Sequence, residues 1–179
     1  MYNNKLCQII RKNMENYILF QPAKFRARRL ERNLLKKFEV QRFFSSDGVK
    51  LFGWFIKPQE NKPVFLFLHG QAESILSHQD VANFCIKNGY GLFILSYRGH
   101  YKSCGHPTEK GTYKDAAAAI KRLKQLGINE NDLILWGHSY GSAVAVETAN
   151  NYNVKAVILQ SPILNFKTAI LGVCKLIMK

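Results

Sequence analysis

With 179 residues, the chain is long enough for one domain with a hydrophobic core and too short for two domains of ordinary size. Its hydrophobic fraction of 47% and aromatic fraction of 12% exclude a disordered or low-complexity protein. The formal net charge of +14, from 26 basic and 12 acidic residues, makes anionic surfaces the partners to consider.

The positive charge is concentrated at the start of the chain. Residues 1–37 contain ten Lys or Arg and two Glu, so they contribute +8 of the +14. We interpret residues 1–38 as a basic, helical arm, either solvated or resting on an anionic membrane surface, and residues 39–179 as the domain. No aromatic stacking pattern or nucleic-acid motif accompanies the charge, so we expect no specific nucleic acid partner.

The first strands form a predicted hairpin. The stretch FEVQRFFSSDGVKLFGWFIKP indicates two strands joined by a turn at Asp47-Gly48. The short apolar run Val64–Gly70 follows and is typical of a strand buried on both faces. After it we expect a helix with Ser77 as its N-cap and Gly89 as its stop.

The unit of strand and helix then repeats. GLFILSYRG predicts a strand, and TYKDAAAAIKRLKQLG predicts a helix that Thr112 caps and Gly127 closes. LILWG and KAVILQS predict two further strands, with helices over Tyr140–Asn150 and from Phe166 onward. This alternation favours an α/β fold with a mainly parallel sheet flanked by helices. Loops after the strands then share one edge of the sheet, and three of them contain His69-Gly70-Gln71, Arg98-Gly99-His100 and His138-Ser139-Tyr140.

The most informative motif lies where LILWG passes into the next helix. Gly137, Ser139 and Gly141 form G-x-S-x-G, a pattern in which a sharp strand-to-helix turn exposes the serine hydroxyl. Main-chain N–H groups at the helix N-terminus favour the negative charge of an attacked carbonyl. We therefore predict Ser139 as a nucleophile, with the amides of Tyr140 and Gln71 as the oxyanion hole.

Four stretches in this order resemble the α/β-hydrolase superfamily, and within it the small serine hydrolases that act on esters, lipids and acyl thioesters: LFLHGQAES, SYRGHYKSCGHPTEKGTYKDAAAAI, GHSYGSAVA and AVILQSPI. The resemblance covers about residues 40–165. It implies an α/β-hydrolase fold and cleavage of a small carboxylic ester or thioester by Ser139. It also implies two further strands after AVILQS, so we expect a C-terminally truncated domain with an apolar, unpaired last strand.

The chain departs from this family at two places. Relatives have Gly in the loop after YRG where this chain has Tyr101, and a positive φ would strain Tyr, so we expect a rebuilt loop. Relatives also place an acid and then His after the serine. From Tyr140 to Lys179 there is no His and no Asp, and the single acidic residue, Glu147, lies about 12 Å along the helix from Ser139. We expect weak or absent activity from this chain by itself.

All five histidines precede the serine. The resemblance implies a structural role for His138, and His69 is expected to stabilise the oxyanion loop. His100 and His106 lie on the loop after FILSY, where either approaches the serine as a base or serves as a loop residue. We assign His69, His100 and His138 to the pocket and His78 to a helix start, and we leave the source of the triad acid and base open.

Arg98 in YRG is expected to brace loops by hydrogen bonds rather than to contact substrate. The four cysteines are far apart and show no zinc-ligand pattern, so we expect reduced thiols, no metal and no cofactor. Charged residues interrupt the first twenty, and the apolar stretch TAILGVCKLIMK is short and contains Lys175, so we expect neither a signal peptide nor a membrane span. We therefore expect a cytoplasmic protein, with attachment to a membrane surface as the alternative.

Three functions stay open at this point. The first is a serine hydrolase of the α/β-hydrolase fold, truncated as given, with a fragment, a split gene or a decayed reading frame as the alternatives and a second polypeptide as a partner that could complete the domain. The second is a non-catalytic pseudo-hydrolase that binds an acyl ligand or a partner through the remaining pocket. The third is a binder of membrane surfaces or nucleic acid through the basic arm.

Overall fold

The structure is a computed structural model that describes residues 34, 36–71, 73 and 75–163. Except for residues 34 and 36–38, the predicted basic arm lies outside the described residues, as does the helix predicted from Phe166 onward. The helices and strands are β1 (Glu39–Phe44), β2 (Lys50–Ile56), β3 (Val64–Leu68), α3 (Gln79–Asn88), β4 (Gly91–Ser96), α4 (Glu109–Gln125), β5 (Leu133–His138), α5 (Tyr140–Ala149) and β6 (Ala156–Gln160), with 3₁₀ turns η1 (Ile75–Ser77) and η2 (Glu130–Asp132).

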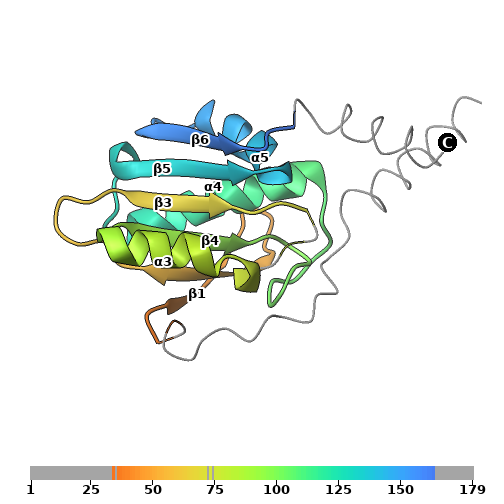
Figure 1. Cartoon of the computed structure of the whole chain (residues 1–179). Helices are drawn as coiled ribbons and strands as arrows, with labels where there is room; N and C mark the ends of the chain where they lie inside the picture. Colours follow the sequence, from red (N-terminus) through yellow and green to blue (C-terminus); the bar gives the residue numbers. More distant parts are fainter. Residues whose placement is uncertain (1–33, 35, 72, 74, 164–179) are drawn as a thin grey trace, which may run out of the picture.

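The strands form one sheet in the order β1-β2-β4-β3-β5-β6 (Figure 1). β2 pairs antiparallel with β1 and β4, whereas β3 pairs parallel with β4 and β5, and β5 with β6. The predicted hairpin and the mainly parallel sheet are therefore both confirmed.

Helices cover both faces of the central strands, which explains why those strands are apolar without interruption. Every residue of β3 and β4 is buried. α4 and α5 pack on one face, around a core that includes Leu66, Phe93 and Leu135. α3 packs on the other face, where Phe67 and Ile94 belong to a second core (Figure 1).

α4 begins earlier than the sequence predicts. Thr108, not Thr112, is its N-cap: its backbone is extended, and its hydroxyl accepts the N–H of Gly111 at 3.1 Å. Thr112 lies one turn further in, where its hydroxyl contacts the Tyr140 hydroxyl at 2.9 Å. Gly127, with φ 85°, directly follows the C-cap, as the prediction of a glycine stop requires.

α3 likewise begins after a different residue from the one predicted. Its N-cap position is His78, because Ser77 belongs to the preceding 3₁₀ turn. The predicted stop at Gly89 is confirmed, since this glycine adopts a left-handed conformation with φ 73°.

The sheet topology brings three loops to one edge. β3 lies between β4 and β5, so the strand order reverses at β3 and the loops after these strands open on the same side. Leu68 pairs in register with Gly137. The loop after β3 therefore lies directly beside the G-x-S-x-G turn.

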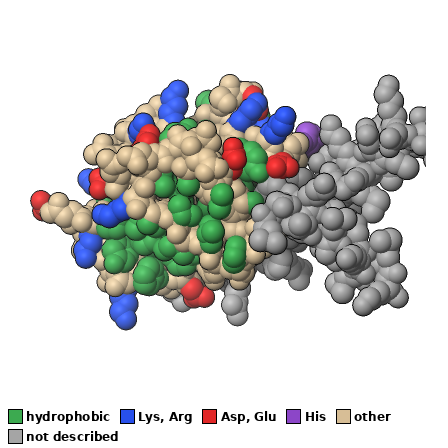
Figure 2. Space-filling view, turned by 90° about the horizontal axis from the view of Figure 1, so that it is seen from above, with side chains coloured by type: hydrophobic (Ala, Val, Ile, Leu, Met, Phe, Trp, Pro, Cys, Tyr) green, Lys and Arg blue, Asp and Glu red, His purple; other side chains and the backbone are tan. Residues whose placement is uncertain are grey.

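The last described strand has one paired edge and exposed side chains. Among the described residues, β6 pairs with β5 alone, and Val157, Ile158 and Leu159 are each about 40% exposed. Seen from the β6 side, Figure 2 shows apolar side chains gathered on this face. An apolar edge strand, as predicted for KAVILQS, is thus present in the described part of the chain.

Candidate active site

Ser139 is the single residue between β5 and α5, and its backbone conformation is strained. Its φ of 49° and ψ of −115° lie outside the regions that side chains ordinarily adopt, a conformation that costs about 1–3 kcal/mol. The Ser139 N–H donates to the Gln160 carbonyl of β6 at 2.9 Å. The side chain is partly buried, and no described residue makes a hydrogen bond to its hydroxyl. The strained turn predicted for this position is present, and exposure of its hydroxyl at the edge of the sheet remains a prediction.

The two glycines of the motif are required by close main-chain contacts. A Cβ on Gly137 would lie 2.5 Å from the Gly141 carbonyl oxygen. A Cβ on Gly141 would lie 1.9 Å from the carbonyl oxygen of Leu68 and 2.8 Å from that of His69. The first turn of α5 therefore packs against the end of β3 at a distance that only glycine permits.

This contact also places the predicted oxyanion residues. Gln71 follows the end of β3 by three positions, and Tyr140 is the first residue of α5. Because α5 and the end of β3 are in contact through Gly141, the segments that carry the two amides are neighbours. Their role as oxyanion donors remains a prediction.

A cluster of histidines surrounds Glu73 beside this turn. The Glu73 carboxylate accepts the Gly70 N–H at 2.6 Å and contacts His138 Nδ1 at 3.1 Å and His78 Nε2 at 3.4 Å. The ring of His69 lies 6.2 Å from that of His78. Sequence reasoning missed Glu73, although it is the single acidic residue between Val64 and Gln79.

Burial and hydrogen bonding determine which side chains of this cluster are neutral and which is ionised. Burial lowers the pKa of His69 to about 3 and also lowers the pKa of His100, so both imidazoles are neutral at pH 7. Burial acts to raise the pKa of Glu73, but its contacts with His78, His138 and the Gly70 amide outweigh burial and bring it to about 2. The carboxylate is therefore ionised at every physiological pH.

The predicted pocket histidines fall into different environments. His69 and His100 are buried, with ring centroids 5.4 Å apart, and His69 Nε2 and His100 Nδ1 have no hydrogen-bond partner among the described residues. His138 is partly exposed and contacts Glu73. His106 is exposed, so the alternative that it approaches the serine gains no support from a contact in the described structure.

Tyr101 adopts the strained conformation that was considered for it from the sequence. Its φ is 43°, so the loop after β4 keeps a left-handed residue despite the bulky side chain. The Tyr101 ring packs edge-on against Phe52 and Trp54, with centroids 5.2 and 6.0 Å apart. Aromatic packing therefore offsets the local strain that a positive φ imposes on Tyr, and the rebuilding of the loop relative to the family remains a prediction.

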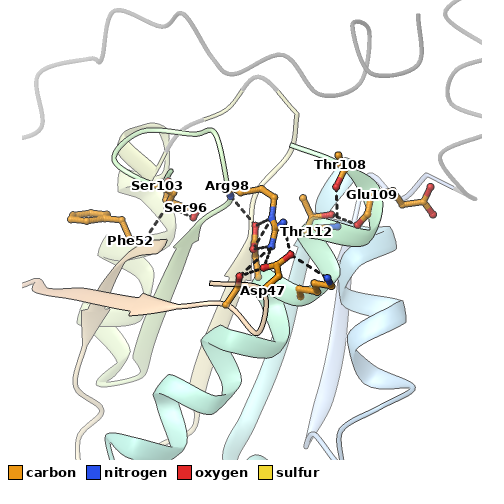
Figure 3. Close-up of polar contacts among 12 residues, drawn as sticks. Asp47, Phe52, Ser96, Arg98, Ser103, Thr108, Glu109 and Thr112 are labelled. Atoms are coloured by element: carbon orange, nitrogen blue, oxygen red, sulfur yellow. Dashed lines mark hydrogen bonds and ion pairs between the residues drawn. The ribbon is translucent and has the colours of Figure 1, made fainter. Parts of the chain in front are cut away.

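Arg98 braces the same loop, as the sequence predicts (Figure 3). Its guanidinium donates to Asp115 of α4 at 2.7 Å and to Asp47 of the hairpin turn at 3.0 Å, and its N–H donates to Asp115 at 2.8 Å. Arg98 and the Ser45 hydroxyl hold the pKa of Asp47 well below its usual range. One buried cation thus ties together the hairpin, the loop after β4 and α4.

Within the described part of the chain, no group of three or more His, Cys, Asp or Glu side chains has an arrangement that could hold a metal ion. Cys85 is buried, and burial raises the pKa of its thiol to about 12, whereas Cys104 is exposed. Neither thiol is paired in a disulfide.

A serine on a strained strand-to-helix turn, at the carboxyl edge of a mainly parallel sheet, defines a protein of the α/β-hydrolase fold. Comparison with solved structures agrees. The esterase Pf2001 of Pyrococcus furiosus superposes with a TM-score of 0.73 at 24% identity, covering 90% of this chain and 63% of that one.

A family model described as "Serine aminopeptidase, S33" matches residues 59–179, and the chain belongs to this family of α/β hydrolases. It is 40% identical over 123 residues to the alpha/beta hydrolase domain-containing protein WAV2 of Arabidopsis thaliana, covering 65% of this chain and 40% of WAV2. It is 34% identical over 125 residues to the human alpha/beta hydrolase domain-containing protein 17B, covering 66% of this chain and 42% of that protein. The chain spans less than half the length of these curated relatives.

Proposed function

We propose that the protein is a serine hydrolase that cleaves carboxylic esters or thioesters of small molecules through Ser139. The observation that carries this proposal is the strained backbone of Ser139, held by glycine contacts that accept no side chain. Family membership and the esterase-like fold of a solved neighbour support the same chemistry. The domain that performs it is residues 39–179.

In the proposed reaction, the Ser139 hydroxyl oxygen attacks the substrate carbonyl carbon and the hydroxyl proton passes to a base. The carbonyl oxygen becomes an oxyanion, which the amides of Gln71 and Tyr140 stabilise by hydrogen bonds. Collapse of this intermediate expels the alcohol or thiol with a proton and leaves an acyl-serine, which water then hydrolyses.

The base for this reaction is not identified within the 179 residues. Residues 140–179 contain no His and no Asp, so no later loop of this sequence supplies the usual partners. Loss of the base typically costs about a million-fold in turnover. We therefore propose slow turnover by these 179 residues alone, with the acid and base supplied from outside them; a second polypeptide that pairs at β6 is one such source.

A second candidate function is a pseudo-hydrolase that binds an acyl ligand or a partner without turnover. It would keep the fold and the serine turn but form no acyl-serine. For location, we propose the cytoplasm, with contact to anionic membranes through residues 1–37 as the alternative. In the described part of the chain, no helix has the length and apolar character needed to cross a bilayer.

A fluorophosphonate probe, which forms a covalent bond with an activated serine, tests the proposal. Because the usual base is not among residues 140–179, we expect slow labelling of the full chain; Ser139→Ala should lose this label, and Ser46→Ala, which changes an exposed serine of the hairpin turn, should keep it. Cooperative thermal unfolding of each variant shows that it is folded. A folded wild-type chain without label would contradict the hydrolase proposal and favour the ligand-binding alternative.

A further inference from the structure

The Glu73 carboxylate contacts two residues that are near it in sequence, Gly70 and His78, and one that is 65 residues away, His138. Its Oε2 accepts the Gly70 N–H at 2.6 Å from the loop after β3. Its two oxygens each lie 3.1 Å from Nδ1 of His138 at the end of β5. Nε2 of His78, directly before α3, lies 3.4 Å away. The carboxylate therefore connects the loop after β3, the end of β5 and the start of α3.

The residues that Glu73 holds directly precede the two functional positions. Gly70 comes before Gln71, whose amide is the proposed oxyanion donor, and His138 comes before Ser139, the proposed nucleophile. An oxyanion hole works only when its donors lie about 2.7–3.1 Å from the developing charge, so the spacing between these two segments matters. The Glu73 side chain contacts both segments and so can hold their spacing.

The local structure is shaped to admit this carboxylate. A Cβ on residue 70 would lie 2.9 Å from Glu73 Oε2, so a glycine there lets the carboxylate reach the N–H. The bond from the Gly70 N–H is short for an N–H donor, as hydrogen bonds to ionised groups are. The Glu73 side chain is 27% exposed, so the carboxylate lies near the protein surface.

We propose that Glu73 is a positioning residue that holds the oxyanion loop and the serine turn at the spacing that acylation needs. This inference rests on the serine hydrolase function proposed above. Glu73 has no proton to donate at neutral pH, because its contacts with Gly70, His78 and His138 favour its ionised form. Its effect is on geometry, through the backbone of two neighbouring segments.

The first test measures the rate of fluorophosphonate labelling in the full chain for wild type, Glu73→Ala and Glu73→Gln. We expect Glu73→Ala to lower the maximal labelling rate about 10- to 100-fold, because displacements near 1 Å have effects of this order, while the probe concentration for half-maximal rate changes little. Glu73→Gln should recover most of the rate, since the amide oxygen still accepts the Gly70 N–H. A structural role alone would not produce this split or this rescue.

The matched control is Glu130→Ala. Glu130 has a similar exposed fraction, 21%, and also accepts a main-chain N–H, that of Asn153, but it precedes β5 at the opposite end from Ser139. We expect this variant to label like wild type. Labelling of Glu73→Ala within about twofold of wild type, against the 10- to 100-fold loss expected, would overturn the positioning role while leaving the hydrolase proposal intact.

A second test does not depend on activity. Amide hydrogen exchange of Gly70, followed by NMR, should be at least about tenfold faster in Glu73→Ala than in wild type, because the hydrogen bond to the carboxylate is lost. If wild type takes no probe, the hydrolase proposal fails, and the exchange rate still decides whether Glu73 holds the loop. Equal exchange in the two proteins would overturn the inference.

Discussion

Gly141 offers a prediction in which two physical effects have opposite signs. It lies in the first turn of α5, where replacing glycine by alanine normally stabilises a helix by about 1 kcal/mol. In this structure, however, the added Cβ would lie 1.9 Å from the Leu68 carbonyl oxygen. We predict that Gly141→Ala destabilises the protein.

The size of the destabilisation follows from the main-chain displacement that the added Cβ requires. Cβ atoms essentially never approach other heavy atoms within 3.0 Å, so α5 and the end of β3 must separate by more than 1 Å. Overpacking in cores costs about 1–3 kcal/mol when side chains can adjust. Here all three obstructing atoms belong to the main chain, the carbonyl carbon and oxygen of Leu68 and the carbonyl oxygen of His69, so we expect a loss of at least about 3 kcal/mol in unfolding free energy.

Thermal unfolding followed by circular dichroism measures the effect. A loss of about 3 kcal/mol lowers the Tm by about 6–12 °C for a chain of this size. The control is Gly127→Ala: no atom lies within 4 Å of its Cβ, but its φ of 85° costs alanine about 1–2 kcal/mol. If Gly141→Ala unfolds at the wild-type temperature or above it, the close contact that defines the serine turn does not exist.

Three further changes test the brace, the buried histidine and the helix cap. Arg98→Ala leaves Asp115 buried without its cation, so urea unfolding should show a loss of about 3–5 kcal/mol, whereas a neutral effect would mean that the brace is dispensable. His69 has a pKa of about 3 in the folded protein against 6.5 ordinarily, so the unfolded state binds more protons and stability should fall as the pH drops from 6.5 toward 3. Calorimetry of His69→Gln should show a shallower fall over that range, and an unchanged slope would contradict the burial of a neutral imidazole. Thr108→Ala should cost about 1 kcal/mol in denaturant unfolding, and no loss would argue against its capping role.

The fold could be predicted because its information is local. Continuous apolar runs indicate strands buried on both faces, and D-G marks the hairpin turn, so each element follows from a window of a few residues. The helix starts were less certain because several polar residues compete for one cap. Thr108 and Thr112 both precede apolar positions of α4, and only the extended backbone at Thr108 decides between them.

The features of the site also differ in whether they depend on local sequence or on contacts between distant residues. The serine turn is local, since both glycines and Ser139 lie within five residues, and its geometry agrees with the pattern. Glu73 and its partner His138 are 65 residues apart, and Arg98 and Asp47 are 51 apart. No spacing rule connects such pairs, because they meet only after the strand order of the sheet has been fixed.

The contacts observed around Ser139 set the geometry of the turn and involve no proton transfer. Among the described residues, Gly137, Gly141 and the end of β3 set the turn, and β6 anchors the Ser139 N–H. The position of the nucleophile therefore does not depend on which group serves as its base. Variants of the turn should change both stability and labelling, whereas addition of a base in a second polypeptide should change labelling and turnover with the turn itself unaltered.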